Sequence, residues 1–416
     1  MSSFCKSIHS LLVIQLVLVI TYGSIHVSAW NYTSTGQVSP LEMGMIKQYL
    51  KNINKPAVKS IKSPDGDIID CIPIDKQPAF DNPLLSNHDI QMVPSMLPTY
   101  RGENYTINTE SIRQAWNDVG SCPNGTVPIR RTTMEDVLRA GSLSQFGKKP
   151  LNDTSISATG SPSKHEYAIA YPAGAQSAIY GTMASFNVWY PYVQKNNEFS
   201  LSQLWITAGS YANSDLNTIE AGWQVYPGLY GDRRSRLFIY WTRDAYQKTG
   251  CYNLLCSGFV QTDRRVAIAG ALSPKSTYGG SQYEITLLVW KDPRSGNWWM
   301  RYRNINVGYW PAKLFTHLSS YATTVQWGGE IVNTSPNRLH TLTDMGSGHF
   351  AEEGFKKASY IRNLKNVDST NTLYSVQSIT TYADHPNCYN VKSYKAANWG
   401  VYFNFGGPGK NSRCTK

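Results

Sequence analysis

The sequence lacks the short motifs that mark the common hydrolytic and metal-binding sites. It contains no Gly-x-Ser-x-Gly elbow, and the GSGH run at residues 346–349 does not have that spacing, which disfavours a serine hydrolase of the α/β type. His165-Glu166 is not followed by the second histidine of a zincin. Cys-x-x-Cys pairs are also missing, which argues against structural zinc. We therefore expect neither a metal nor another cofactor.

Long apolar runs are missing too, except one near the start of the chain. Lys6, the apolar residues 11–20 and the small residues 27–29 are typical of a secretory signal, and that run is too short to span a bilayer. We expect residues 1–29 to be removed and the mature protein to be secreted, outside the cell or in the cell wall, with the vacuole as an alternative. Five sequons agree with this route and are candidate glycosylation sites: Asn31, Asn104, Asn124, Asn152 and Asn333.

Acidic residues are scarcer than basic ones, and the formal net charge is +11. This charge is compatible with an acidic partner, such as nucleic acid or a pectin-like polymer. The arginine clusters, however, are scattered through strand-like stretches, and no nucleic-acid-binding motif accompanies them. A solvated sheet face explains them better, and we expect no nucleic-acid partner.

Seven cysteines become six once Cys5 leaves with the signal. Six cysteines permit 15 pairings, and sequence alone does not choose among them. Proximity favours disulfides that join Cys71 with Cys122, Cys251 with Cys256, and Cys388 with Cys414. Such pairing leaves no free thiol for catalysis in the mature chain.

The chain is longer than one hydrophobic core usually serves, so we expect two folded parts. In the first, a capping box at residues 39–42 opens a helix that ends before Pro56, a strand covers residues 68–74, and a second helix runs from Thr133 to Gly141. Nothing in this part looks catalytic. Residues 141–164 are rich in Ser, Gly, Pro, Thr and Asn, which predicts an exposed, easily cut linker.

From Glu166 onward, short strands separated by turn signals dominate. One helix is expected at residues 311–321. Many short strands with almost no helix predict a mainly β protein, an antiparallel two-sheet β-sandwich preceded by a small α+β domain. The expected strands cover residues 167–171, 179–192, 201–208, 217–225, 236–241, 259–267, 283–290, 298–303, 374–381 and 400–405.

The candidate catalytic groups in this second part are paired carboxyl groups. Two carboxyls that share a site can activate water and donate a proton, because repulsion keeps one protonated while the other is ionised. Glu220 is flanked by Ile219 and Ala221, and Glu330 follows a Trp-Gly-Gly run, so both are candidates for burial. Alternatively, Glu220 faces water on a half-exposed strand. Glu284 is a rival on a strand face that looks merely polar.

Four stretches of this part resemble motifs of the neprosin family, plant secreted proteins in which two glutamates act together in a glutamic peptidase. They are IEAGWQVYP at 219–227, GCYNLLCSGFVQ at 250–261, GNWWMRYRNINVGYWPAKLF at 296–315 and WGGEI at 327–331. The resemblance implies an activation peptide at residues 30–140, an activation linker at 141–164 and a catalytic β-sandwich at 165–416. It also implies the catalytic pair Glu220 and Glu330, cleavage of peptides or proteins next to proline, and the propeptide as an intramolecular inhibitor.

The sequence therefore predicts an acid-acting endopeptidase made as a zymogen, in which either glutamate is the acid. We favour an ionised Glu220 that holds the water and a protonated Glu330. The rings of Trp223, Tyr240 and Trp327 are candidate walls for a proline ring, although core packing is the commoner use of aromatic side chains. The alternative functions are a secreted glycan-binding or wall-binding β-sandwich without catalytic activity, and a glycosidase, which also needs paired carboxyls.

Overall fold

The computed structural model describes residues 38–100, 112–149, 165–174, 178–335 and 339–414. The expected signal at residues 1–29, Cys5, linker residues 150–164 and three sequons (Asn31, Asn104 and Asn152) lie outside these ranges. The chain divides into two compact units, residues 1–48 and 49–416. The domain boundaries expected at residues 140 and 165 both fall inside the second unit. Among the described residues, no helix is long and apolar enough to cross a membrane.

The amino-terminal region forms the small α+β arrangement that the sequence predicts. Helix α2 (Pro40–Ile53) begins after Ser39, whose hydroxyl accepts the Glu42 N–H, and helix α3 (Met134–Arg139) begins with a capping box between Thr133 and Asp136. Three strands pair antiparallel in the order β1-β2-β5, and Cys71–Cys122 ties this sheet to a loop. These strands are β1 (Lys59–Lys62), β2 (Ile68–Pro73) and β5 (Thr126–Arg130).

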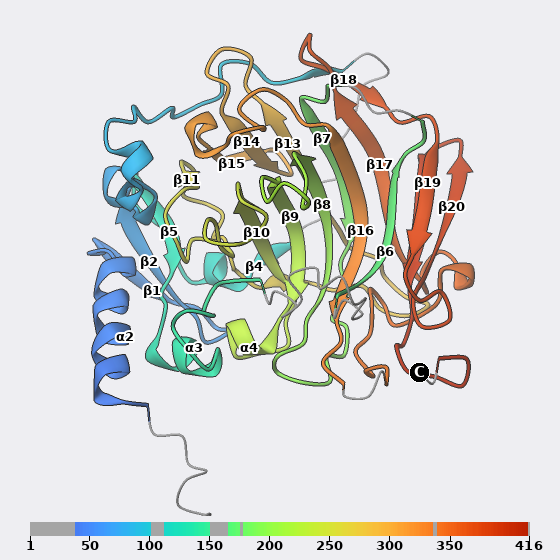
Figure 1. Ribbon diagram of the computed structural model, residues 1–416, viewed down its shortest axis with the longest axis horizontal. Coiled ribbons are helices and arrows are strands. Elements are labelled where there is room, and N and C mark those ends of the chain that lie inside the picture. The colour runs from blue at the N-terminus through green and yellow to red at the C-terminus, as the bar shows by residue number, and fades with distance from the viewer. Residues whose placement is uncertain (1–37, 101–111, 150–164, 175–177, 336–338, 415–416) are drawn as a thin grey trace, which may run out of the picture. The chain divides into compact units, whose positions relative to one another are not determined.

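A six-stranded antiparallel sheet carries the two candidate glutamates (Figure 1). Along each strand, side chains alternate between the face that packs against a second sheet and the opposite face. In spatial order the strands are β10 (Arg236–Thr242), β9 (Asn217–Val225), β8 (Ser200–Ala208), β16 (Thr324–Val332), β6 (His165–Pro172) and β19 (Ile379–Ala383).

The second sheet packs on the first, and a continuous apolar core joins them. Its spatial order is β11 (Val260–Gln261), β15 (Ile305–Trp310), β14 (Trp298–Tyr302), β13 (Glu284–Lys291), β7 (Gly181–Asn187), β17 (Ser359–Val367), β18 (Thr372–Ser375) and β3 (Thr99–Tyr100), and β21 (Gly400–Gly406) joins β17 to β20 (Asn390–Ala396). The antiparallel two-sheet fold is thus as predicted.

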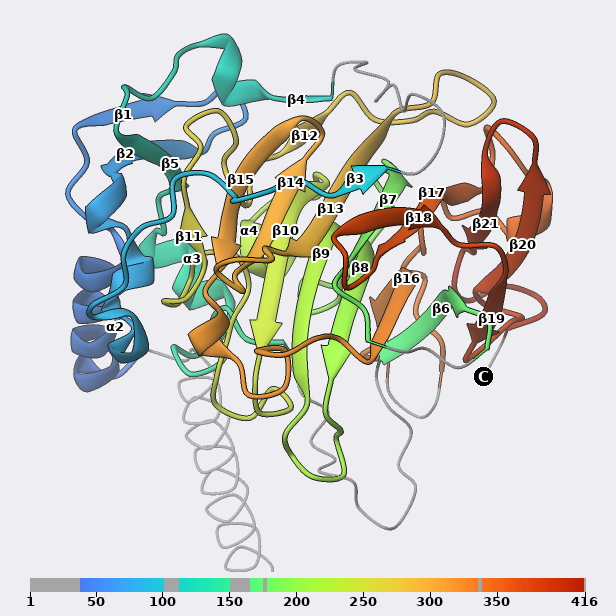
Figure 2. The same ribbon diagram turned by 90° about the horizontal axis from the view of Figure 1, so that it is seen from above.

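The amino-terminal region also adds strands to the sandwich. In Figure 2 the chain that follows β2 crosses β15, β14 and β13 to reach β3, which pairs in parallel with β18. Farther along, β4 (Arg113–Gln114) pairs with β12 (Leu272–Ser273). Short helical turns complete the structure, namely Ile74–Lys76, Pro78–Asp81, Pro83–Leu85, Ala115–Asp118, α4 (Pro227–Tyr230), Ala312–Leu314 and Ala351–Glu353.

Three sequence-based assignments of secondary structure are wrong. The helix expected at residues 311–321 is only the turn Ala312–Leu314, because the side-chain oxygen of Asn217 accepts the N–H groups of residues 316–318 that a helix would use. The strand expected at 259–267 is two residues long. The strand expected at 374–381 is two strands, β18 and β19, which belong to different sheets.

Candidate active site

Glu220 and Glu330 lie on the same face of the six-stranded sheet, on strands that are separated by β8. Glu220 is on β9 and Glu330 is on β16, and the side chain of Gln203 on β8 lies between them. The alternation that turns Glu220 outward turns Ile219 and Ala221 into the core, where they pack against the second sheet. The apolar neighbours that suggested burial therefore belong to the other face of the strand.

The two carboxyl groups converge on one ammonium, that of Lys149. Its Nζ lies 3.1 Å from Oε2 of Glu220 and 3.1 Å from Oε2 of Glu330, so these oxygens are no more than twice that distance apart. Nε2 of Gln203 donates to the same two oxygens, at 3.2 and 3.3 Å. Both glutamates are completely buried. One water in the place of the ammonium would contact both carboxyl groups.

The second oxygens of the two carboxyl groups have different partners. Oε1 of Glu220 accepts hydrogen bonds from two hydroxyl groups, that of Tyr246 at 2.5 Å and that of Thr218 at 3.1 Å. Oε1 of Glu330 lies 2.5 Å from Nδ1 of His165, at the start of β6. Glu330 therefore has a basic partner within the sandwich, whereas Glu220 has only neutral donors there. The pair is chemically asymmetric.

Burial alone would raise the pKa of Glu330, because it penalises the charged form. The charge of Lys149 and the hydrogen bond from His165 outweigh that penalty, and the pKa of Glu330 lies below its usual value. Burial likewise opposes the charge of Lys149, but the two carboxylates raise its pKa well above the usual range. Burial and the charge of Glu220 raise the pKa of the Tyr246 phenol, which stays a hydrogen-bond donor.

Aromatic rings flank both glutamates on the same face. Glu220 is paired across the strands with Tyr240 and Trp205, and Glu330 with Tyr167. The rings of Tyr167 and Trp205 meet edge to face, with centroids 6.2 Å apart.

The structure corrects two of the three expected substrate walls. Tyr240 lies on the face of the glutamates, as expected, but Trp223 and Trp327 point into the core between the sheets. Their indole N–H groups donate to the carbonyl of Asn187 and the hydroxyl of Thr182, both on β7 of the other sheet. Since each lies an odd number of residues from its neighbouring glutamate, strand alternation turns it away from the site.

Residues 141–149 do not form the exposed linker that their composition predicts. Phe146 and Lys149 are buried, and Nζ of Lys148 donates to the carbonyls of Lys248 and Gly250. This segment and the sandwich enclose a cavity of about 510 Å³, lined by Lys149, Tyr226, Tyr246 and Val332 among others. Four residues of the site were not predicted from the sequence, because nothing in their local sequence indicates a role there: Lys149, Gln203, His165 and Tyr246.

The other acids of the sandwich are engaged elsewhere. Glu284 pairs with Arg362 and accepts a hydrogen bond from Tyr360, so the rival candidate is part of an ion pair on the second sheet. Glu198, which the sequence places in a turn, is completely buried and accepts hydrogen bonds from Thr334, Thr341 and Thr343. Neither approaches the Lys149 ammonium within hydrogen-bonding distance.

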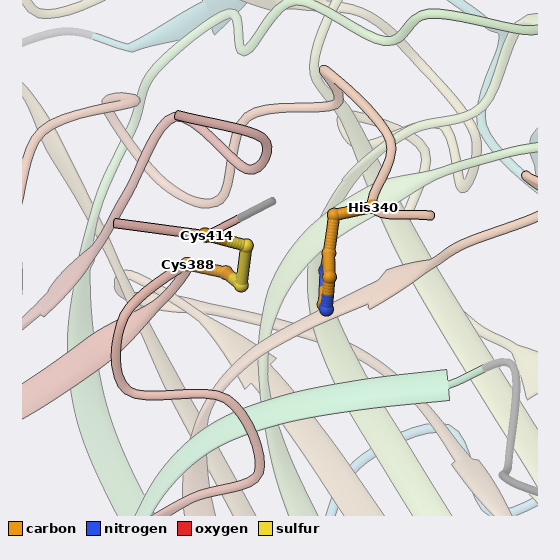
Figure 3. A group of neighbouring side chains, drawn as sticks. All are labelled: His340, Cys388 and Cys414. Carbon is orange, nitrogen blue, oxygen red and sulfur yellow. A yellow bond between two sulfur atoms is a disulfide. The ribbon is translucent and has the colours of Figure 1, made fainter. Parts of the chain in front are cut away.

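Two groups of side chains within the described ranges have the proximity of metal ligands. One contains His340, Cys388 and Cys414, but Figure 3 shows that its two sulfurs are bonded to each other, so neither is available as a thiolate. In the other, the buried Glu166 and His340 lie with Oε2 and Nδ1 3.3 Å apart, next to the exposed His385.

All three disulfides that proximity suggested are present: Cys71–Cys122, Cys251–Cys256 and Cys388–Cys414. Two of the sequon asparagines lie in described residues. Asn124 is exposed. Asn333 is half-buried, and its amide donates to Glu166 and to the Leu339 carbonyl, bonds that a glycan on this nitrogen would disturb.

These observations define the class of this protein. It is a mainly β sandwich with two buried, converging glutamates, and an amino-terminal segment closes the site. The family model described as Neprosin matches residues 196–408, just over half of the chain, and the model described as Neprosin activation peptide matches residues 60–171. The chain belongs to the Neprosin family.

The solved structures to which this chain is similar are distant. Scytalido-glutamic peptidase with a peptide-based transition state analogue has 10% identity and a TM-score of 0.30, covering 58% of this chain and 97% of its own. SCP-B, a member of the Eqolisin family of peptidases in complex with the tripeptide Ala-Ile-His, gives the same values. The CBM40 of the Ruminococcus gnavus IT-sialidase, bound to α2,6 sialyllactose, has 12% identity and a TM-score of 0.22, covering 41% of this chain and 92% of its own.

Proposed function

We propose that this protein is a secreted glutamic endopeptidase made as a zymogen, with Glu220 and Glu330 as its catalytic pair. The observation that carries the proposal is the convergence of two buried carboxyl groups on one ammonium, where a water fits between them. Membership of the Neprosin family and the match to its activation peptide support a peptidase made as a zymogen. A glycan-binding module has no use for two buried acids at one point.

The different hydrogen-bond partners of Glu220 and Glu330 indicate which glutamate is the base and which is the acid. Glu330, which has His165 as a basic partner within the sandwich, is the ionised group that takes a proton from the water, while the water oxygen attacks the peptide carbonyl carbon. Glu220, held by the neutral hydroxyls of Tyr246 and Thr218, carries the proton and gives it to the leaving nitrogen as the C–N bond breaks. The proton then passes from Glu330 to Glu220, which restores the pair. This assignment reverses the one favoured by the sequence.

Lys149 supports the zymogen part of the proposal, because its ammonium occupies the place of the catalytic water. The Lys149 segment must therefore leave before substrate enters. Activity then needs a pair that shares one proton, a state that acid favours. A preference for proline follows from the family resemblance, with the Tyr240 and Trp205 rings as the candidate walls of the subsite.

The test is to replace each glutamate by glutamine, which removes the titrating oxygen and keeps the size. Both Glu220→Gln and Glu330→Gln should lower kcat by at least about 10³-fold in acid on a proline-containing peptide, because proton transfer by each group is lost. Thermal unfolding would verify the fold. Glu353→Gln, at an exposed position, is the control and should cleave normally. Cleavage by either site variant at the parent rate would refute the assignment.

A further inference from the structure

Three aromatic residues form a row across neighbouring strands of the second sheet, far from the glutamates in the fold. Trp290 on β13 is paired with Trp299 on β14, which is paired with Tyr309 on β15. All three are completely buried. They are covered by residues 86–98, here called the strap, which is the chain that crosses β15, β14 and β13 in Figure 2. The strap lies within the residues that match the Neprosin activation peptide.

Every side-chain polar atom of this row is bonded to the strap. The Tyr309 hydroxyl accepts the Gln91 N–H at 2.9 Å and lies 2.8 Å from the His88 ring nitrogen. The Trp299 N–H donates to the Gln91 side chain, and the Trp290 N–H donates to the Met96 carbonyl.

Two polar side chains beside the row complete the set of contacts. Asp292 accepts from the backbone N–H and the hydroxyl of Ser95 and from the Gln91 amide, at 2.5, 2.8 and 3.4 Å, and Asn297 donates to the same Gln91. His88, Gln91 and Ser95 are therefore the strap side chains that bond the row and the two polar residues beside it. By contrast, the apolar side chains of Met92, Val93 and Met96 are about half exposed or more.

The orientation of the rings decides what such a groove can bind. Trp299 and Tyr309 stack on each other with centroids 4.9 Å apart and planes at 36°, and Trp290 and Trp299 at 6.3 Å and 29°. Because the rings face one another, their N–H and O–H edges meet the ligand. A sugar needs ring faces for stacking, whereas a peptide needs donors and acceptors for its backbone.

We propose that in the processed protein this row is a second peptide-binding site, which takes a polypeptide segment with Gln and Ser four residues apart. The proposal rests on the proposed function only in that removal of the activation peptide exposes the row. The site lies on the second sheet and would hold a protein substrate by a segment outside the catalytic cleft.

The experiment uses the Glu330→Gln variant, so that the probe is not cut, with a site for an external protease in the linker at residues 150–164. This makes processing independent of the protein's own activity. After gel filtration and a mass check that residues up to the cut are gone, fluorescence anisotropy measures binding of a labelled peptide with the sequence of residues 86–98. The expected results are saturable binding by the processed form and none by the uncut form.

Matched variants identify the site. Tyr309→Phe should weaken binding three- to tenfold, since one hydroxyl that serves two partners is lost, and replacing both Gln91 and Ser95 of the peptide by Ala should weaken it at least tenfold. Tyr382→Phe, whose hydroxyl bonds Asp384 on the other sheet, makes the same chemical change as a control. The proposal is overturned if the processed form does not bind the peptide, if Tyr309→Phe binds like Tyr382→Phe, if soluble polysaccharide displaces the peptide, or if the activation part stays bound after the cut.

Discussion

At the scale of single residues, the site depends on a lysine that brings together two acids of different strands. A buried ammonium between two carboxylates is stable only as a unit, because any member left alone would be an unpaired charge in a dry environment. Lys149 is therefore the strongest structural support for the pairing of Glu220 with Glu330 and, in the proposed mechanism, the obstacle to catalysis.

Replacing Lys149 by Met keeps the side-chain length and removes the charge. The uncut variant should process itself faster in mild acid than the parent, because the activation segment loses two ion pairs at the glutamates. Gel electrophoresis over time at a fixed mildly acidic pH measures this. Lys148→Met is the neighbouring control, since Lys148 bonds only backbone carbonyls in the described structure. If both variants process at the parent rate, Lys149 does not restrain activation.

His165→Gln tests the assignment of the base. His165 helps to hold the pKa of Glu330 below its usual value, so its loss should raise that pKa. Since the base must be ionised, the acidic limb of the kcat/KM profile of the processed enzyme should move to higher pH, with a modest fall in kcat. His349→Gln, at a surface pair with Glu353, should leave the profile unchanged. An unmoved acidic limb would mean that His165 has only a structural role.

At the scale of elements, a buried ionic network joins the amino-terminal region to the edge of the six-stranded sheet. Asp67, just before β2, accepts from Arg236 of β10 and from Arg130 of β5. Burial opposes the charge of Asp67, but these two arginines outweigh it and hold its pKa below the usual value. Arg236 is itself almost completely buried.

Asp67→Asn should destabilise the uncut protein by about 1.5–3 kcal/mol, because it removes charged hydrogen bonds to the buried Arg236, which keeps only Asp232 as a charge partner. Urea unfolding of the intact chain is the measurement. Asp263→Asn breaks an ion pair with the largely exposed Arg265 and should cost less than about 1 kcal/mol. Equal losses in the two variants would show that the network does not hold the elements together.

At the scale of the whole molecule, the two links between the activation segments and the sandwich respond to acid in the same direction. Asp67 and Glu330 both have lowered pKa values, so their contribution is fully present above the ordinary carboxyl pKa and is lost as the pH falls through the lowered values. Loss of these charges leaves Lys149 with Glu220 and Arg236 with Asp232 as their remaining carboxylate partners.

The activation segments should therefore stay closed at neutral pH and open only below the ordinary carboxyl range, at about pH 4 and lower. Limited proteolysis of the Glu330→Gln chain by an added acid-stable protease, sampled across pH, would follow cleavage between residues 140 and 165. Asp67→Asn should shift the opening toward neutral pH. Opening near pH 7 in the parent chain would contradict this linkage.

Local sequence patterns predicted most of the helices and strands. The capping box at Ser39 predicted the first amino-terminal helix, the second was expected from Thr133, and the expected strand at residues 217–225 has the bounds of β9. The same local signals failed where distant groups intervene. The side chain of Asn217 takes the N–H groups that a helix near residue 316 would use, and no pattern around residue 316 contains that information.

By itself, the sequence determined the family, the two-sheet class and the two candidate glutamates, because each depends on motifs or alternation within short stretches. Proximity in the sequence only favoured the disulfide pairs, which the structure contains. Only the tertiary structure decided which side chains meet. The strand order β9-β8-β16 places Gln203 between the two acids, and the packing of the linker brings Lys149 into contact with both. Strand alternation turns Trp223 and Trp327 into the core. Contacts between residues far apart in the chain depend on strand order and face, and strand order is a property of the folded whole.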